Sequence, residues 1–257
     1  MAFSSDLLRK KRNSLKNLSG GKDESSCLFV KTGNSLIKNG RFVEAIWYFN
    51  KALEIYPDSP EIWNNMGLAI SRTGRLAEAI TCYNIALKDK HDDVEVIYNK
   101  ALAHEELGQS GEAIKCYDKL LEKNSLDAVA WCSKGDVLFE SGNFEEAIIA
   151  YERSIKLDPK NEISWNNMGF THVKLNNLSE AIDSYEKALE INPKIEKIWS
   201  NKGLALAKLR DSEKKLDLQK IAVSIRSEGS EKESGEFLRA GLRSIERSKN
   251  MKEDLDL

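Results

Sequence analysis

The chain is poor in residues that interrupt helices. Its 257 residues include only 4 prolines and 15 glycines. Proline lacks a backbone donor and clashes with the preceding helical turn, and glycine weakens a helix interior. A chain with few of either can form many helices, so the composition favours an all-α protein.

Cysteine and histidine are also too few and too scattered to indicate a metal or a disulfide framework. None of the cysteines forms a C-x-x-C pair, and they stand at Cys27, Cys82, Cys116 and Cys132. Free thiols in a reducing compartment are the ordinary state of such residues. We therefore expect no metal and a cytoplasmic protein. His104 and His172 lie far apart, and we expect them to be hydrogen-bonded residues of the core or its edge.

Further absences narrow the function. No apolar run reaches the length of about 18 residues that a membrane helix needs, and the start lacks the apolar segment of a secretory signal. Lys plus Arg is 39 against 41 for Asp plus Glu, and this balance argues against a nucleic-acid partner. No phosphate-binding loop, metalloprotease motif or nucleophile elbow is present. We therefore expect no catalytic residues, no cofactor and no membrane partner.

What the sequence does contain is a repeat of 34 residues. Four registers keep this period without an insertion from residue 26 to about 210. One register is small, with Gly33, Gly67, Ala101, Gly135, Gly169 and Gly203. A second is Ala45, Ala79, Ala113, Ala147 and Ala181. A third is aromatic, with Phe49, Tyr83, Tyr117, Tyr151 and Tyr185. The fourth is Phe29, Trp63, Ile97, Trp131, Trp165 and Trp199.

Each window of the repeat is expected to form two helices. In the second window Trp63, Met66, Gly67 and Ile70 share one face of the first helix at 100° per residue. Gly74 then ends that helix, and residues 76–88 form the second. The small residues allow the two helices to approach closely. A single pair cannot bury its apolar face, so neighbouring pairs must stack.

This pattern resembles the tetratricopeptide repeat family. The fourth window carries the match in its W…G…L, A…Y and P elements, at Trp131, Gly135, Leu138, Ala147, Tyr151 and Pro159. Lys100, Lys134 and Lys202 depart from it by standing where the family has Leu. The resemblance implies an all-α, right-handed superhelical solenoid of antiparallel helix pairs, with five full repeats, a partial sixth and a C-terminal cap. It also implies that the first helices line a concave groove.

The chain divides accordingly. Residues 1–25 are expected to be a basic, disordered arm, with a targeting role for Arg9–Arg12 as the alternative. The repeats occupy 26–59, 60–93, 94–127, 128–161, 162–195 and, in part, 196–210. Residues 211–226 are expected to form a capping helix with a polar face. Residues 227–257 are expected to be a polar linker followed by a helix.

Asparagines recur on the face of the first helices that is expected to line the groove. They are Asn34, Asn64, Asn65, Asn99, Asn166, Asn167 and Asn201. An amide offers both a donor and an acceptor, which is what a peptide backbone needs. Some relatives use an asparagine ladder in this way, and the resemblance implies the same use here. The alternative is that these amides pair with the adjacent repeat.

Carboxylates share that face in the middle repeats, at Glu95, Glu105, Glu106, Asp136 and Glu140. They indicate a groove with an acidic middle, unless they form only a solvated surface. Chaperone-binding relatives hold an acidic C-terminal tail through Lys and Asn. Asn34 and Asn65 fit that clamp, but Val30 and Glu95 stand where Lys is needed, so we do not expect such a tail as partner.

The sequence thus predicts a scaffold that binds a peptide segment or helix of a partner protein, with a basic segment as one option. The alternative is a regulatory or targeting subunit of a catalytic complex whose activity lies in another chain. Residues 237–250 carry Arg239, Arg243 and Arg247 on one stripe beside an apolar side. That segment is expected either to cap the solenoid or to compete with the partner in the groove.

Overall fold

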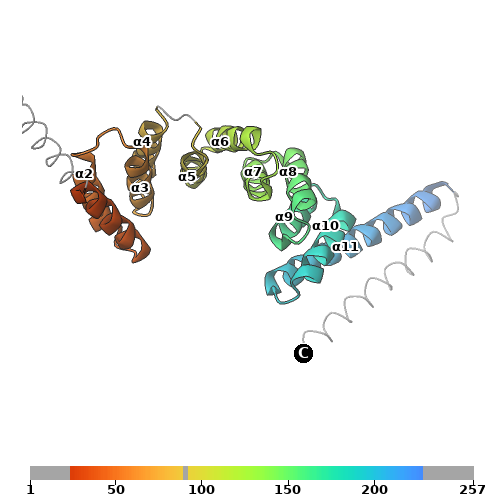
Figure 1. Cartoon of the computed structure of the whole chain (residues 1–257). Coiled ribbons are helices and arrows are strands. Elements are labelled where there is room, and N and C mark those ends of the chain that lie inside the picture. Colours follow the sequence, from red (N-terminus) through yellow and green to blue (C-terminus); the bar gives the residue numbers. More distant parts are fainter. Residues whose placement is uncertain (1–23, 89–91, 228–257) are drawn as a thin grey trace, which may run out of the picture. The chain divides into compact units, whose positions relative to one another are not determined.

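The computed structural model describes residues 24–88 and 92–227, with side chains described to residue 220. Every regular element within these ranges is a helix (Figure 1). The chain forms two compact units, Met1–Lys160 and Asn161–Leu257. The predicted arm, apart from helical residues 24 and 25, lies outside the described residues, as does the predicted linker and helix from residue 228 onward.

The first unit is a row of antiparallel helix pairs. A helix over residues 24–38 is followed by α2 (Phe42–Leu53), α3 (Pro60–Ser71), α4 (Leu76–Ala86), α5 (Val94–Glu106), α6 (Ser110–Lys123), α7 (Ala128–Glu140) and α8 (Phe144–Leu157). From α2 onward each helix packs against the next, and the first helices α3 and α5 also touch directly. Helices α3, α5 and α7 start at the first residues of the second, third and fourth windows.

Left-handed residues separate the two helices of a pair. Gly40, Gly74, Gly108 and Gly142 have φ between 68° and 83°, and Asn176 has φ of 62° in the second unit. Glycine has no Cβ and adopts this region freely, and asparagine tolerates it. These residues end each first helix and let the chain turn into the second. The helix break predicted at Gly74 is therefore confirmed, and the corresponding residues of the other repeats break their helices in the same way.

The core depends on contact between a glycine of the first helix and a ring of the second. A methyl group on Gly67 would lie 2.6 Å from Cε1 of Tyr83, and one on Gly135 would lie equally close to Tyr151. Both rings are buried, and so are the repeating alanines Ala45, Ala79, Ala113 and Ala147. Because glycine has no side chain, the ring can lie directly on the backbone of the neighbouring helix.

The second unit contains α9 (Glu162–Lys174), α10 (Leu178–Ile191) and α11 (Glu196–Ser227). Helix α10 packs against both α9 and α11. The buried ring of Tyr185 lies on Gly169 just as Tyr83 lies on Gly67. Ile198 and Ala205 of α11 are buried in the same core as Tyr185.

Helix α11 differs from the expected organisation. A capping helix at residues 211–226 was expected to be separate from residues 196–210, but the structure has one helix of 32 residues across both (Figure 1). Arg210 occupies the place that Gly74, Gly142 and Asn176 hold in complete repeats. Arginine is a good helix former and avoids positive φ, so nothing turns the chain there.

Candidate functional site

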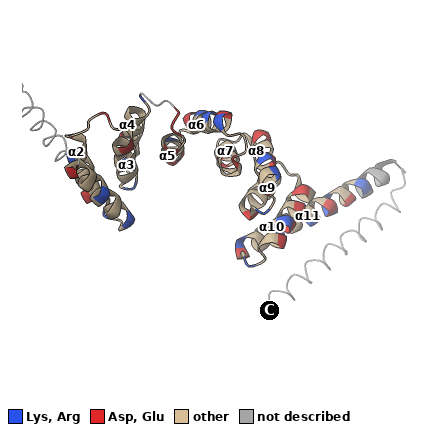
Figure 2. Ribbon diagram, viewed as in Figure 1, with Lys and Arg blue, Asp and Glu red and all other residues tan. Residues whose placement is uncertain are grey.

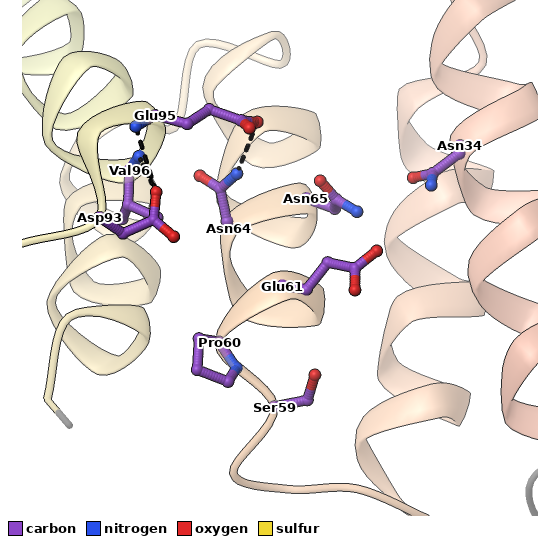
Figure 3. Close-up of a pocket in the computed structure, with 9 residues that line it drawn as sticks. All are labelled: Asn34, Ser59, Pro60, Glu61, Asn64, Asn65, Asp93, Glu95 and Val96. Carbon is purple, nitrogen blue, oxygen red and sulfur yellow. Dashed lines mark hydrogen bonds between the residues drawn. The ribbon is translucent and has the colours of Figure 1, made fainter. Parts of the chain in front are cut away.

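A cavity of about 540 Å³ opens among the first helices of the first unit (Figure 3). It lies between the helix over residues 24–38, helix α3 and the start of α5. Nine residues line it: Asn34, Ser59, Pro60, Glu61, Asn64, Asn65, Asp93, Glu95 and Val96. Four of them, Asn34, Asn64, Asn65 and Glu95, belong to the surface that the sequence analysis predicted to bind a partner.

The starts of two helices position this site. Pro60 is at the start of α3, where its fixed φ suits a helix and its missing N–H costs nothing. Asp93 caps α5, and its Oδ1 accepts from the backbone N–H groups of Glu95 and Val96 at 3.1 and 3.4 Å. The cap holds Glu95 in the first turn, where the helix dipole favours its negative charge.

Two amides at the cavity are available to a ligand. Asn34 and Asn65 are half-buried and reach the cavity from facing helices (Figure 3). Within the part of the chain that the structure describes, neither side chain forms a hydrogen bond. Each amide therefore keeps its donors and its acceptor free. A peptide backbone offers the complementary groups at every residue.

The lining of the cavity is acidic. Glu61, Asp93 and Glu95 contribute carboxyl groups, and none of the nine lining residues is Lys or Arg. Glu61 was not among the predicted site residues, although it holds the same place in its window as Glu95 does in the next. That shared place was the signal that could have found it. A cavity with this lining favours a cationic ligand over an anionic one.

Other asparagines of the predicted ladder are engaged within the fold. The Asn99 Nδ2 donates to Asn64 Oδ1 at 3.1 Å, and the Asn64 Nδ2 donates to Glu95 Oε1 at 3.0 Å. Asn64 is only 5% exposed. These bonds join the first helices α3 and α5 of neighbouring repeats. Pairing with the adjacent repeat, the alternative that the sequence left open, therefore accounts for Asn64 and Asn99.

The second unit repeats this arrangement. The Asn201 Nδ2 donates to Asn166 Oδ1 at 3.2 Å, which links α11 to α9, and the Asn166 Nδ2 donates to Asn167 Oδ1 at 2.9 Å. In both units, therefore, an asparagine pair at these repeat positions joins the first helices of neighbouring repeats. Of the seven asparagines predicted to line the groove, Asn34 and Asn65 are the two whose side chains form no hydrogen bond among the described residues.

A second acidic group lies at the other end of α5. Glu105 and Asp136 are half-buried there, and Glu106 and Glu140 are exposed. Burial raises the pKa of Glu105 to about 7; the nearby Tyr117 hydroxyl lowers it, and the charges of Asp136, Glu140 and Glu106 raise it further. Its Oε1 is buried without a hydrogen-bond donor among the described residues.

Asp136 has a structural partner as well. The hydroxyl of the buried Tyr151 donates to Asp136 Oδ1 at 2.7 Å. Burial, followed by the negative charge of Asp136, raises the pKa of Tyr151, so the tyrosine stays protonated and keeps donating. Asp136 therefore fixes a core ring while presenting charge on the predicted surface.

Two of the three lysines that depart from the family pattern, Lys134 and Lys202, have carboxylate partners in the structure. Lys134 Nζ lies 2.5 Å from Asp118 Oδ1 and 5.4 Å from the centre of the Trp131 ring. Lys202 Nζ lies 2.8 Å from Glu186 Oε1. Both lysines are half-buried along their apolar side-chain carbons, and each Nζ pairs with a carboxylate of the preceding helix.

The predicted core role holds for His104, which is buried with Nδ1 2.7 Å from Gln109 Oε1. In the described part of the chain no group of three His, Cys, Asp or Glu residues is arranged to hold a metal ion. The helices between residues 24 and 227 also include none with the length and apolar content to cross a bilayer.

Comparison with known proteins agrees with this architecture. Tetratricopeptide repeat family models match residues 33–74, 98–162 and 163–195. The chain belongs to the tetratricopeptide repeat family, and its fold is that of an all-α repeat protein. No curated protein matches it.

Solved structures share the fold at low identity. MamA from residue 41 to its end, from Desulfovibrio magneticus RS-1, is 20% identical with a TM-score of 0.63, over 66% of this chain and 97% of that one. Another MamA structure is 23% identical with a TM-score of 0.62, over 68% and 96%. YrrB, described as a TPR protein with an unusual peptide-binding site, is 20% identical with a TM-score of 0.62, over 73% and 97%.

Proposed function

We propose that this chain is a protein-interaction scaffold whose first unit binds an extended, lysine- or arginine-bearing segment of a partner protein. The observation that carries the proposal is the composition of the cavity. Two free amides, Asn34 and Asn65, stand beside the carboxyl groups of Glu61, Asp93 and Glu95, without a lining Lys or Arg. The proposal assigns no reaction to the chain.

The two kinds of group have different tasks. The amides of Asn34 and Asn65 hydrogen-bond the ligand backbone, which fixes its direction without reading its sequence. The carboxylates select a cationic side chain and repel an acidic one. The peptide-binding site named for YrrB supports a peptide as the class of ligand. The same charges disfavour the acidic tails of chaperones.

The acidic residues further along α5 and α7 extend the proposed surface. Glu105, Glu106, Asp136 and Glu140 follow Glu95 on first helices of the same unit. A partner segment with several spaced cationic residues could contact both groups. When one partner segment contacts both acidic groups, binding at the first raises its effective concentration at the second. We therefore expect longer basic segments to bind more tightly.

The test is a binding titration of the full chain with labelled short peptides of one polar background that carry lysines, glutamates or neither. The lysine peptide should bind best, and its affinity should fall with salt. Asn34→Ala with Asn65→Ala removes two hydrogen bonds worth about 1 kcal/mol each, so Kd should rise about thirtyfold. Glu61→Gln with Glu95→Gln should weaken the lysine peptide and flatten its salt dependence.

The matched control is Asn84→Ala, which removes an exposed amide of α4 that does not line the cavity. Its affinity should equal that of the unmodified chain. Equal affinity of the lysine and glutamate peptides would refute the proposed charge selection. An unchanged Kd in the Asn34→Ala, Asn65→Ala variant, with its fold intact, would remove these amides from the site.

A further inference from the structure

Helix α11 has the face of a first helix, but among the described residues no second helix of its own repeat packs against it. In four complete repeats a ring covers the glycine of the first helix, with Phe49 on Gly33, Tyr83 on Gly67, Tyr151 on Gly135 and Tyr185 on Gly169. Gly203 holds the same place in α11. No described atom lies within 4 Å of the position that a methyl group on Gly203 would take.

The side chains around Gly203 are apolar and exposed. Trp199 is 53% exposed and Leu206 is 45% exposed, whereas Leu138, which holds the place of Leu206 in the fourth repeat, is 7% exposed. The Trp199 Nε1 donates to the Pro193 carbonyl at 2.9 Å. Trp63 and Trp131 make the corresponding bond in complete repeats, to Pro57 and Ser125. The indole is thus held in the orientation of a complete repeat.

The chain that follows directly cannot cover this face. Arg210 continues the helix, and α11 runs on to Ser227. A continuous helix does not fold back on its own start. Residues 211–220, the part of its second half whose side chains the structure describes, carry charges of both signs (Figure 2). The missing helix must therefore come from beyond residue 227 or from another chain.

Residues 238–248 carry the sequence pattern of a second helix. In α10 this pattern is Leu178, Ala181, Ile182, Tyr185 and Ala188. The same spacing is found at Leu238, Gly241, Leu242, Ile245 and Ser248. Serine at the last place has a precedent in the fourth repeat, where Ser154 of α8 is fully buried. The pattern places three apolar residues and two small residues on one face.

We propose that residues 238–248 pack on α11 as the second helix of the sixth repeat, with Ile245 over Gly203 between Trp199 and Leu206. This contact completes the apolar core of the second unit and closes the end of the repeat array. It does not depend on the peptide-binding function proposed for the first unit.

The connecting segment is long enough. At about 1.5 Å per residue, Gly203 lies about 36 Å from Ser227 along α11. A returning helix covers about 10 Å of this between residues 238 and 245. Residues 228–237 must then span about 26 Å, and ten extended residues reach about 33 Å. The returning segment also runs antiparallel to α11, as the second helix of each pair does.

Hydrogen exchange of the full chain, followed by mass spectrometry, tests the proposal. Peptides covering 199–206 and 238–248 should both be protected at low protein concentration. Ile245→Asp should raise exchange in both segments about tenfold or more, because a buried apolar contact is lost. The matched control is Ser244→Asp, next to it but outside the shared pattern, which should leave both segments protected. Circular dichroism should show the repeats folded in each variant.

Three results would count against the proposal. Residues 238–248 could exchange at the rate of an unstructured peptide in the unmodified chain. Alternatively, protection of 199–206 could rise with protein concentration together with the sedimentation coefficient, which would assign the face to a second copy. Equal loss of protection in the Ile245→Asp and Ser244→Asp variants would also count against the packing of one specific face.

Discussion

Replacing Glu105 by Gln should alter how the stability of this protein depends on pH. The Glu105 carboxyl is half-buried between α5 and its neighbours, and its Oε1 has no hydrogen-bond donor among the described residues. Burial is the main cause that raises its pKa to about 7, and the charges of Asp136, Glu140 and Glu106 add to it. The folded chain therefore tolerates the protonated carboxyl better than the ionised one.

The sign of the effect follows from proton linkage. An unfolded glutamate has a pKa of about 4.3, so between about pH 4.5 and pH 7 the folded chain holds the extra proton. The free energy of unfolding should fall as pH rises through this window and level off above pH 7. A tenfold difference in proton affinity between the folded and unfolded chains corresponds to about 1.4 kcal/mol, but solvent reaches this half-buried group, so we expect a loss of about 1–2 kcal/mol.

The assay is urea unfolding of the two chains at pH 5 and at pH 8. The amide of the Glu105→Gln variant is neutral at both values, so the variant should be more stable than the unmodified chain by about 1–2 kcal/mol at pH 8 and nearly equal at pH 5. The control is Glu106→Gln, an exposed neighbour whose change should stay within about 0.5 kcal/mol at either pH. Parallel pH profiles for the Glu105→Gln variant and the unmodified chain would refute this account of the site.

Other substitutions separate packing from binding. Gly67→Ala places a methyl against Tyr83 and should be less stable than Gly111→Ala, whose methyl meets nothing within 4 Å, by about 1–3 kcal/mol in chemical denaturation. Asn64→Ala leaves the partners of a buried amide unpaired and should lower the free energy of unfolding by about 1–3 kcal/mol, whereas Asn65→Ala should lower only peptide affinity. Asp127→Ala removes the cap of α7 and should lower the melting temperature, at a cost of about 1 kcal/mol.

The repeat architecture could be predicted from sequence because every repeat has the same local steric and backbone requirements. Gly67 is needed where the Tyr83 ring meets a backbone, and Gly74 is needed where φ is positive. Identical demands recur every 34 residues, so they leave a period that one sequence reveals. The continuity of α11 has the same cause. Ending the helix would require a residue with positive φ at position 210, and Arg210 does not adopt that conformation readily.

The candidate site was only partly predictable, because side-chain pairing between helices decides it. Asn64 and Asn65 are neighbours in sequence and both line the cavity, yet Asn64 is buried and hydrogen-bonded between repeats, whereas Asn65 forms no hydrogen bond among the described residues. Helical spacing turns them about 100° apart on one broad exposed face and cannot say which amide finds a partner. The bond between Asn99 and Asn64 joins residues far apart in the chain, and only the packing of α3 against α5 creates it.

The most direct test of the central claim is a nuclear magnetic resonance titration of the isotope-labelled chain with the lysine-bearing peptide. The side-chain amide signals of Asn34 and Asn65 should shift most, together with the backbone signals of Glu61 and Glu95, and they should move in proportion to the bound fraction. Those of Asn84 should stay in place. Shifts that are absent from Asn34 and Asn65, or that are the same with the glutamate-bearing peptide, would contradict the claim that this acidic cavity binds basic peptide segments.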